Sequence, residues 1–216
     1  NSSRSDISGS NFYELSRSLY NLFNENQGDI RRGPGVGTNI IDGTSKVEPF
    51  YESIGDYRSK DILVINKYPG NTAQDDPLLN DFFIFRLGEM YMIKAEALVG
   101  KGNINGSSNS AAVTMRRFRQ LRGAGTAQII YADATAAWAD ILKERRRELA
   151  LEGHRWLDIK RLGQKAGGLG VDRYSRDCEQ YNSCTLAPTS YKFTLPIPTS
   201  EIIANRNISG QQNTGY

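Results

Sequence analysis

The stretch ILKERRRELALEGHRWLDIKR, residues 141–161, carries the signals that decide the fold of this chain. Apolar residues recur at helical spacing from Trp138 to Leu149, and Thr135 can cap a helix that we expect to reach about Glu152. Gly153 should end this helix. Residues 155–162 then predict a second, shorter helix at an angle to the first.

One arginine interrupts the apolar face of the longer helix. Arg145 shares that face with aliphatic residues, so it requires a buried or half-buried carboxylate as a partner. Glu148 is close along the helix, and Glu96 or Asp158 could reach it from another element. The sequence leaves all three open.

Further helices are expected on both sides of this stretch. Helical spacing predicts helices over residues 11–24, 81–100 and 110–122, and a last turn over 201–204. Asn80 or Asp81 can cap the second of these, and Thr199 or Ser200 the last. Residues 87–91 match the L-G-x-x-Y element of a tetratricopeptide helix, where a glycine permits close helix packing.

Two short strands, over residues 62–65 and 191–195, complete the prediction. Long loops fill most of the remaining chain, including residues 164–190. We therefore expect a mainly α fold with one tetratricopeptide-like helix pair and two short strands. The chain should be a single domain, with a loop-rich part over 1–80 and a helical core over 81–216.

Composition excludes several functional classes. The 216 residues have a formal net charge of +3, and arginine supplies 18 of the 27 basic residues. This weak bias is far from that of an obvious nucleic-acid binder. The arginines of residues 116–122 would spread around a helix, so we interpret them as salt-bridge partners. The sequence also contains no apolar run long enough to cross a membrane.

The residues that could perform catalysis are few. His154 is the sole histidine and sits beside a helix end, where a capping role is expected. Glu144 and Glu148 are four residues apart among arginines, which would keep both ionised and suits a structural role better than acid catalysis. Glycines 33–37 lack the phosphate-loop pattern. We therefore predict a protein that is not an enzyme and needs no cofactor or metal.

Cys178 and Cys184 are separated by six residues in a loop. They can close a small disulfide ring, which would indicate an oxidising compartment. Two free thiols remain an alternative. A zinc site is the weakest alternative, because zinc normally takes four ligands and the sole histidine is distant in sequence.

Four ordered motifs resemble the SusD/RagB family of surface nutrient-binding lipoproteins. Residues 85–98, FRLGEMYMIKAEAL, resemble its FRLAEMYLIRAEAL segment, and residues 118–125 resemble LNxLRxRAG. Residues 141–161 are similar to ILxERRxELAFEGxRWxDLxR. The C-terminal residues 195–216 resemble PIPxxEIxxNPxLxQNPGY. The departures are Leu151 in place of Phe, and Arg206 and Thr214 in place of Pro.

The resemblance implies a SusD-like α-domain whose shared motifs are structural. It implies that one set of residues locks the helices together: Arg145, Glu148, Arg155, Trp156 and Asp158. It also implies a partner, a SusC-like TonB-dependent transporter in the outer membrane, and a lipid anchor at an N-terminal cysteine that this chain lacks. On this basis we expect Asn1 to be a cut within a longer, cell-surface protein.

The family's ligand residues lie in variable loops, so they do not transfer by motif. Sugar rings stack on exposed aromatic side chains, and the loop aromatics here are Tyr51, Tyr57, Tyr174 and Tyr181. We take these four as candidate glycan contacts, with ordinary packing of the loops as the alternative for each, and expect Trp138 and Trp156 in the core. Two alternatives remain open, a RagB-like oligopeptide binder and a helical scaffold without a ligand site.

Overall fold

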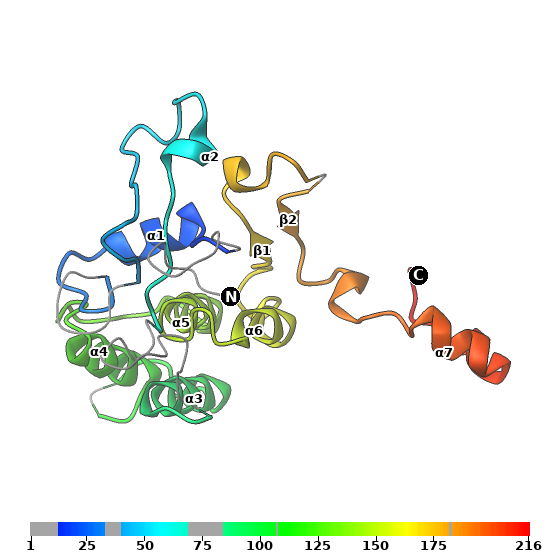
Figure 1. The fold of residues 1–216 in the computed structure, drawn as a ribbon. Coiled ribbons are helices and arrows are strands. Elements are labelled where there is room, and N and C mark those ends of the chain that lie inside the picture. The colour runs from blue at the N-terminus through cyan, green and yellow to red at the C-terminus, as the bar shows by residue number, and fades with distance from the viewer. Residues whose placement is uncertain (1–12, 33–39, 69–83, 107, 182) are drawn as a thin grey trace.

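The computed structural model describes residues 13–32, 40–68, 84–106, 108–181 and 183–216 (Figure 1). The described chain is mostly helical and has one antiparallel pair of two-residue strands, which confirms the predicted mainly α fold. The helices and strands, in chain order, are α1 (Arg17–Asn24), α2 (Tyr57–Lys60), α3 (Leu87–Gly100), α4 (Ala111–Leu121), α5 (Ala134–Glu148), α6 (His154–Leu162), β1 (Val171–Asp172), β2 (Thr185–Leu186) and α7 (Thr199–Ala204). Three 3₁₀ helices lie at Ser175–Cys178, Tyr191–Phe193 and Arg206–Gln211.

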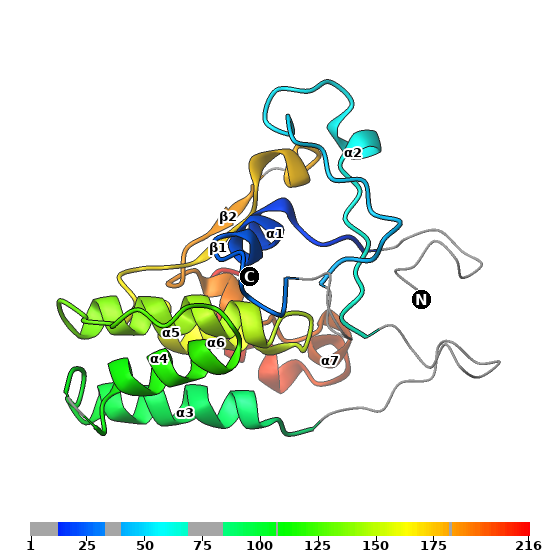
Figure 2. The same ribbon diagram turned by 90° about the vertical axis from the view of Figure 1, so that its left-hand side faces the viewer.

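The main core lies between α3, α4 and α5, which Figure 2 shows side by side. Met92 of α3, Met115 and Phe118 of α4, and Ile141 of α5 are at most 1% exposed there. Helical spacing places these apolar side chains on facing sides, so their burial drives the packing. A second cluster, around Phe23 and Leu63, packs α1 and the extended segment 62–65 against the end of α5.

Helix ends differ from the expectation by up to six residues, since α1 begins at Arg17 and not near residue 11, and α3 begins at Leu87 and not near residue 81. The side chain of Asp133, not of Thr135, caps α5 by accepting a hydrogen bond of 2.8 Å from the Ala136 amide. The helix ends at Glu148 because the following turn takes Leu151 and Gly153 through positive φ, at 66° and 81°. The proposed caps Asn80 and Asp81, like glycines 33–37, lie outside the described residues.

The strands are where the sequence prediction was wrong. Residues 191–195 do not form a strand, because Tyr191–Phe193 is a 3₁₀ turn capped by Ser190. Residues 62–65 are extended but make isolated bridges to three different places in the chain. The actual pair, β1 and β2, lies inside the predicted 164–190 loop, with Val171 opposite Leu186.

Two buried glutamates of α5 hold the core to the loop-rich N-terminal part. Glu148 binds Arg31 at 3.1 Å, Arg86 at 2.9 Å and Arg122 at 2.7 Å, and is 3% exposed. Glu144 accepts hydrogen bonds from Arg31 of the loop after α1 at 2.7 Å, from Arg119 of α4 at 2.8 Å and from Arg147 of its own helix at 3.2 Å. This arginine–glutamate network explains why the chain is rich in arginine, whose guanidinium suits such fixed pairing.

Acid should weaken the fold through this network. Burial alone would raise the pKa of Glu144, but the charges of Arg31, Arg119 and Arg147 outweigh it and lower the pKa to about 2 from 4.5. A lowered pKa stabilises the fold above pH 4.5, and that stability is lost as the pH falls towards 2. The shift corresponds to roughly 3 kcal/mol.

We therefore expect the free energy of unfolding, measured with urea, to fall steeply between pH 4.5 and 2. The Glu144→Gln variant is the control, since it should be less stable at pH 7 and show a shallower fall. Equal slopes in the two proteins would contradict this assignment.

The motif residues of α5 and α6 lie in different environments. Arg145 binds Asp158 at 2.8 Å and Glu96 at 3.3 Å, which are two of its three expected partners, whereas Glu148 belongs to the network above. Trp138 is half-buried against the core. Trp156 is 39% exposed and stacks on Phe193 at 4.3 Å, so the expectation that it lies in the core was wrong.

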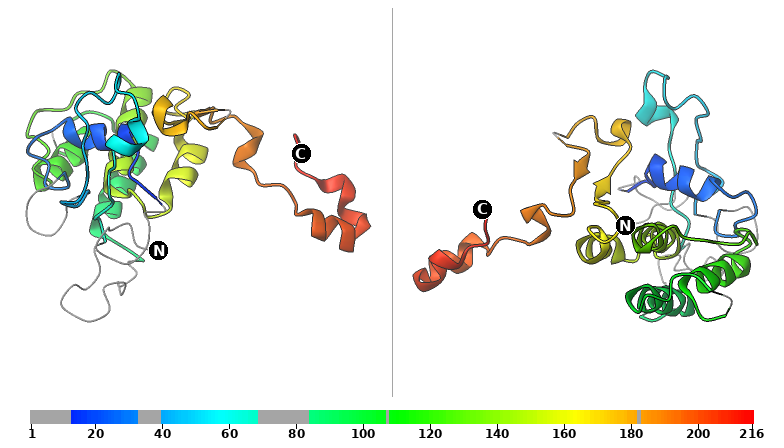
Figure 3. Two further views of the ribbon diagram at one scale, coloured as in Figure 1. Left: turned by 45° about the horizontal axis from the view of Figure 1, so that its top comes forward. Right: turned by 180° about the vertical axis from the view of Figure 1, so that it is seen from behind.

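The chain after β2 leads away from the helical body, and α7 and the C-terminus lie apart from it (Figures 1 and 3). We call residues 187–216 the C-terminal arm. Two distant parts of it are joined by hydrogen bonds, because the Gln212 side chain donates to the Ile197 carbonyl at 3.0 Å and accepts from the Ile197 amide at 2.8 Å. Within the described part of the chain, no helix is long and apolar enough to cross a membrane.

Candidate ligand-binding site

Three of the four candidate tyrosines lie together. The ring of Tyr174 packs edge-on against Tyr51 at 5.4 Å and against Tyr57 at 5.9 Å between centroids. Tyr51 and Tyr57 come from the loop around α2, whereas Tyr174 precedes the 3₁₀ helix Ser175–Cys178. Segments more than 100 residues apart in sequence therefore meet through aromatic contacts.

Asp177 fixes this cluster to α1. Its carboxylate accepts hydrogen bonds from the Tyr57 hydroxyl at 2.6 Å and from the Arg17 amide at 3.0 Å. Burial, together with this hydrogen bond, raises the pKa of Tyr57, which stays a neutral donor at any physiological pH. The Arg17 guanidinium lies 3.8 Å from the centroid of the Tyr51 ring and 3.4 Å from the Asp61 carboxylate.

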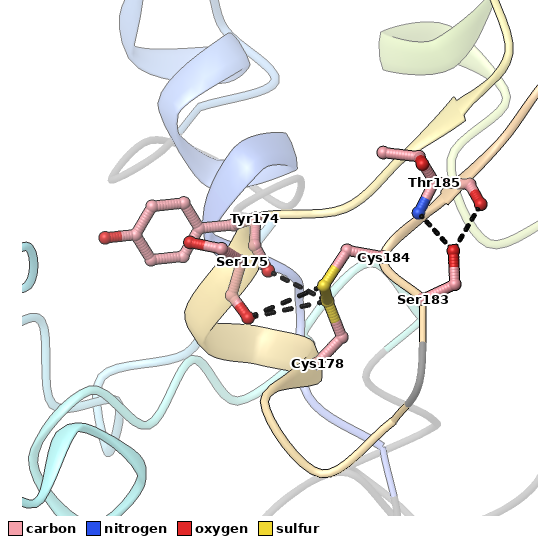
Figure 4. The surroundings of a disulfide bond; sticks show 6 residues. All are labelled: Tyr174, Ser175, Cys178, Ser183, Cys184 and Thr185. Atoms are coloured by element: carbon pink, nitrogen blue, oxygen red, sulfur yellow. Dashed lines mark hydrogen bonds between the residues drawn. A yellow bond between two sulfur atoms is a disulfide. The ribbon is translucent and has the colours of Figure 1, made fainter.

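Tyr181 stands apart from this cluster on a small closed ring of chain. A disulfide joins Cys178, at the end of the 3₁₀ helix, to Cys184, next to β2, with the Cα atoms 5.7 Å apart (Figure 4). Ser183, inside the ring, donates its hydroxyl hydrogen to the Thr185 carbonyl at 2.8 Å. Tyr181 lies within the ring and is 62% exposed, so it is anchored yet open to solvent.

A cleft of about 410 Å³ opens between the disulfide ring, α2 and the chain before α1. We call it the tyrosine cleft. Its lining includes Tyr13, Glu14, Tyr57, Arg58, Asp61, Arg173, Asp177 and Tyr181. Burial and the charges of Asp61 and Asp177 raise the pKa of Glu14. The lining thus combines aromatic faces with both donors and acceptors.

The cleft contains two of the four tyrosines expected to contact ligand. Tyr57 lines it but is only 6% exposed, so it offers an edge and not a face. Tyr181 offers an open face. Tyr51 and Tyr174 are half-buried behind the cleft and support it. Sequence reasoning missed the charged lining, above all Asp61 and Asp177, because no motif surrounds either residue.

The described residues include no group of three or more His, Cys, Asp or Glu side chains that could hold a metal ion. His154 begins α6 and lies 3.8 Å from Glu89, away from the residues that line the tyrosine cleft. Glu144 and Glu148 are committed to arginines inside the protein.

Comparison with known proteins agrees with this arrangement of helices and motifs. The model of the SusD family matches residues 53–216, and the chain therefore belongs to the SusD family. The match begins well before the motifs at 85–98, so it includes part of the loop-rich region.

Two curated relatives are similar to the chain. It is 30% identical over 137 residues to the starch-binding protein SusD of Bacteroides thetaiotaomicron, a match that covers 63% of this chain and 22% of that protein. It is 25% identical over 206 residues to the SusD-like protein P2 of Formosa agariphila, which covers 87% of this chain and 37% of that protein. The chain thus spans well under half the length of these relatives. No solved structure gives a significant match.

Proposed function

We propose that the chain is a non-enzymatic, glycan-binding part of a cell-surface protein, and that the tyrosine cleft is its binding site. The observation that carries this proposal is the open ring of Tyr181 beside a polar cleft. Membership of the SusD family, and the similarity to a protein named for starch binding, support glycans as the ligand class.

The cleft suits a carbohydrate on physical grounds. Sugars present apolar C–H faces, which stack on aromatic rings, and hydroxyl groups, which bind carboxylates and guanidinium groups. The cleft volume of about 410 Å³ falls within the range of small-molecule sites, about 300–1,000 Å³. The Cys178–Cys184 ring restrains Tyr181 before ligand arrives, which reduces the entropy lost on binding.

The proposal also covers the location of the protein in the cell. A disulfide persists in oxidising compartments, which agrees with the outer surface of a bacterial cell. We propose that the whole protein is held at the outer membrane through an N-terminal lipid anchor. There it would deliver its ligand to a SusC-like TonB-dependent transporter.

Removing the Tyr181 ring is expected to weaken glycan binding about tenfold, the loss of one stacking contact of roughly 1.4 kcal/mol. A glycan array with neutral oligosaccharides identifies the ligand, and calorimetry then compares the wild-type chain with Tyr181→Ala. Tyr216→Ala is the matched control, because Tyr216 is a half-exposed tyrosine in the C-terminal arm, where its ring contacts Tyr191.

Unchanged affinity in Tyr181→Ala would show that the tyrosine cleft is not the glycan-binding site. Binding of peptide pools without any glycan would favour an oligopeptide-binding component. Capture of a SusC-like protein with no ligand of either kind would favour a scaffold.

A further inference from the structure

A larger hollow of about 770 Å³ lies beside the β1–β2 pair, and Ser183 and Cys184 of the disulfide ring are part of its lining. It is bounded by the chain leading into α1, the C-terminal end of α5, the first half of α6, and β1 and β2, elements that Figure 1 shows around one region of the body. Its lining shares residues 14–16 and Arg173 with the tyrosine cleft, so the two hollows adjoin. The proposed function leaves this hollow unused.

The charge of its lining is uneven. Five cationic side chains face three carboxylates: Arg145, Arg146, Arg155, Arg173 and Lys192 against Glu14, Asp158 and Asp172. Asp158 is already committed to Arg145 at 2.8 Å and to Arg161 at 2.7 Å. Burial, together with the charges of Asp61 and Asp177, raises the pKa of Glu14. We call the hollow the basic groove.

Two arginines in the groove form no ion pair within the described chain, although Asp172 lies near Arg146 and Asp158 near Arg155. The Arg155 Nη1 atom is buried and makes no hydrogen bond within the described chain. Arg146 is partly buried and donates to a neutral partner, the Ser18 hydroxyl, at 2.7 Å. Burial, and then the charge of Arg146, lower the pKa of Arg155 to about 10, so the two guanidinium groups oppose each other.

An arrangement of this kind destabilises the fold unless another interaction compensates for it. A buried guanidinium without a hydrogen-bond partner is unfavourable, and a second positive charge beside it adds to the cost. Arg145, one residue before Arg146, also has a buried Nη1 atom without a hydrogen bond, but it forms ion pairs with two carboxylates. Arg155 lacks such a partner within the described chain, and its groove is open.

An aromatic face completes the site. Trp156 also lines the groove, is 39% exposed and is braced from behind by Phe193. A sugar ring stacked on an indole can carry a negative substituent to a neighbouring guanidinium, which binds carboxylate and sulfate oxygens through paired N–H groups. The exposed ring of Trp156, which the sequence did not predict, would then contact the sugar.

We propose that the basic groove is a second subsite, which binds a negatively charged group of a glycan, a uronate carboxylate or a sulfate ester, through Arg155 and Arg146 beside Trp156. The inference rests on the proposed function, because it names the charge of the glycan. The two hollows share part of their lining, but Arg146, Arg155 and Trp156 do not line the tyrosine cleft, so the two proposals can fail separately.

Calorimetry on the full 216-residue chain tests the proposal with three oligosaccharides of matched length: trigalacturonate, a sulfated galactotriose and neutral galactotriose. The wild-type chain is expected to bind at least one acidic sugar about tenfold more tightly than the neutral one, the effect of one charged hydrogen-bonded contact. The acidic sugar that gains affinity identifies the source of the charge. The gain should shrink as salt is raised.

Arg155→Gln is expected to abolish this preference while leaving neutral affinity unchanged. Its melting temperature should equal or exceed that of the wild type, because a buried charge without a partner is removed; a purely structural arginine would lower it. Lys192→Glu, an exposed change at the rim, should reduce the preference without touching the interior. Arg117→Gln, on the exposed side of α4, is the matched control.

Three results would overturn the inference: no preference for either acidic sugar, a preference that survives both Arg155→Gln and Lys192→Glu, or an equal loss in Arg117→Gln. Tyr181→Ala separates the two proposals. If it lowers the affinity of all three sugars and keeps the acidic preference, both hollows act. If it has no effect while Arg155→Gln does, the tyrosine cleft fails and the basic groove stands.

Discussion

Replacing Glu148 with glutamine is expected to lower the free energy of unfolding by about 3–5 kcal/mol, the usual effect of removing one partner from a buried ion pair. Glu148 binds three arginines, from the loop-rich part, from the residue before α3 and from the end of α4. A neutral amide cannot balance these charges, and its NH₂ group faces donors. Urea unfolding followed by circular dichroism at pH 7 measures the loss.

The matched control is Glu201→Gln. Glu201 is an exposed glutamate of α7, outside the helical core, and its replacement should change stability by less than about 0.5 kcal/mol. The size of the Glu148 effect depends on burial, because exposed ion pairs contribute little. A loss below about 1 kcal/mol in Glu148→Gln would show that water reaches the arginines and that the network is not the lock between the two parts of the chain.

Gly88→Ala should be the second most damaging change, although alanine is the better helix former. A Cβ atom on Gly88 would overlap the Glu148 carboxylate, with 2.9 Å to its Cδ and 3.0 Å to its Cγ. Overpacking of this kind costs about 1–3 kcal/mol. The carboxylate must also move away from its arginines, so we expect a net loss of about 2–4 kcal/mol after the helix propensity gain of about 1 kcal/mol.

The same helix supplies the control. Gly100 ends α3, and a Cβ atom there would have no neighbour within 4 Å, so Gly100→Ala should stabilise the protein by about 0.5–1 kcal/mol. Gly88→Ala and Glu148→Gln act on one carboxylate, so the double variant should lose less than the sum of the two. Additive losses would show that the glycine and the glutamate act independently.

The tetratricopeptide-like motif therefore predicted the right feature for a reason that only the structure shows. The glycine of L-G-x-x-Y does permit a close approach, but what approaches is the carboxylate of Glu148 and its arginines. The sequence predicted the presence of these regular helices, with ends up to six residues away, because α3, α4 and α5 each bury one continuous face. Helical spacing records that face directly in the sequence.

The short strands could not be predicted in the same way. β1 and β2 have two residues each, too few for an alternating pattern, and the turn between them is closed by the disulfide. The false strand at 191–195 alternated in sequence because Phe193 is buried between exposed neighbours. A 3₁₀ turn that buries one side chain produces the same local pattern.

The sequence identified the residue types of the candidate site but not their arrangement or exposure. Four loop tyrosines were named, and whether each is open or buried depends on distant groups, such as Asp177 and Arg17. Trp156 shows the same limit. Its position in a helix predicted a buried side chain, but in the structure it contacts Phe193 and remains partly exposed. The basic groove depends on which arginines lack partners, and that follows only from the folded chain.

The position of Arg31 has a consequence for the order in which the chain folds. Arg31 reaches Glu144 and Glu148 across 113 and 117 residues of sequence, whereas α3, α4 and α5 follow one another closely. Contacts of such long range form late, because a long loop must first be closed. A ribosome releases Arg31 before α5, so Arg31 can pair with its neighbour Asp29 but not with Glu144 or Glu148 until α5 has emerged, and we expect its docking on α5 to complete the fold.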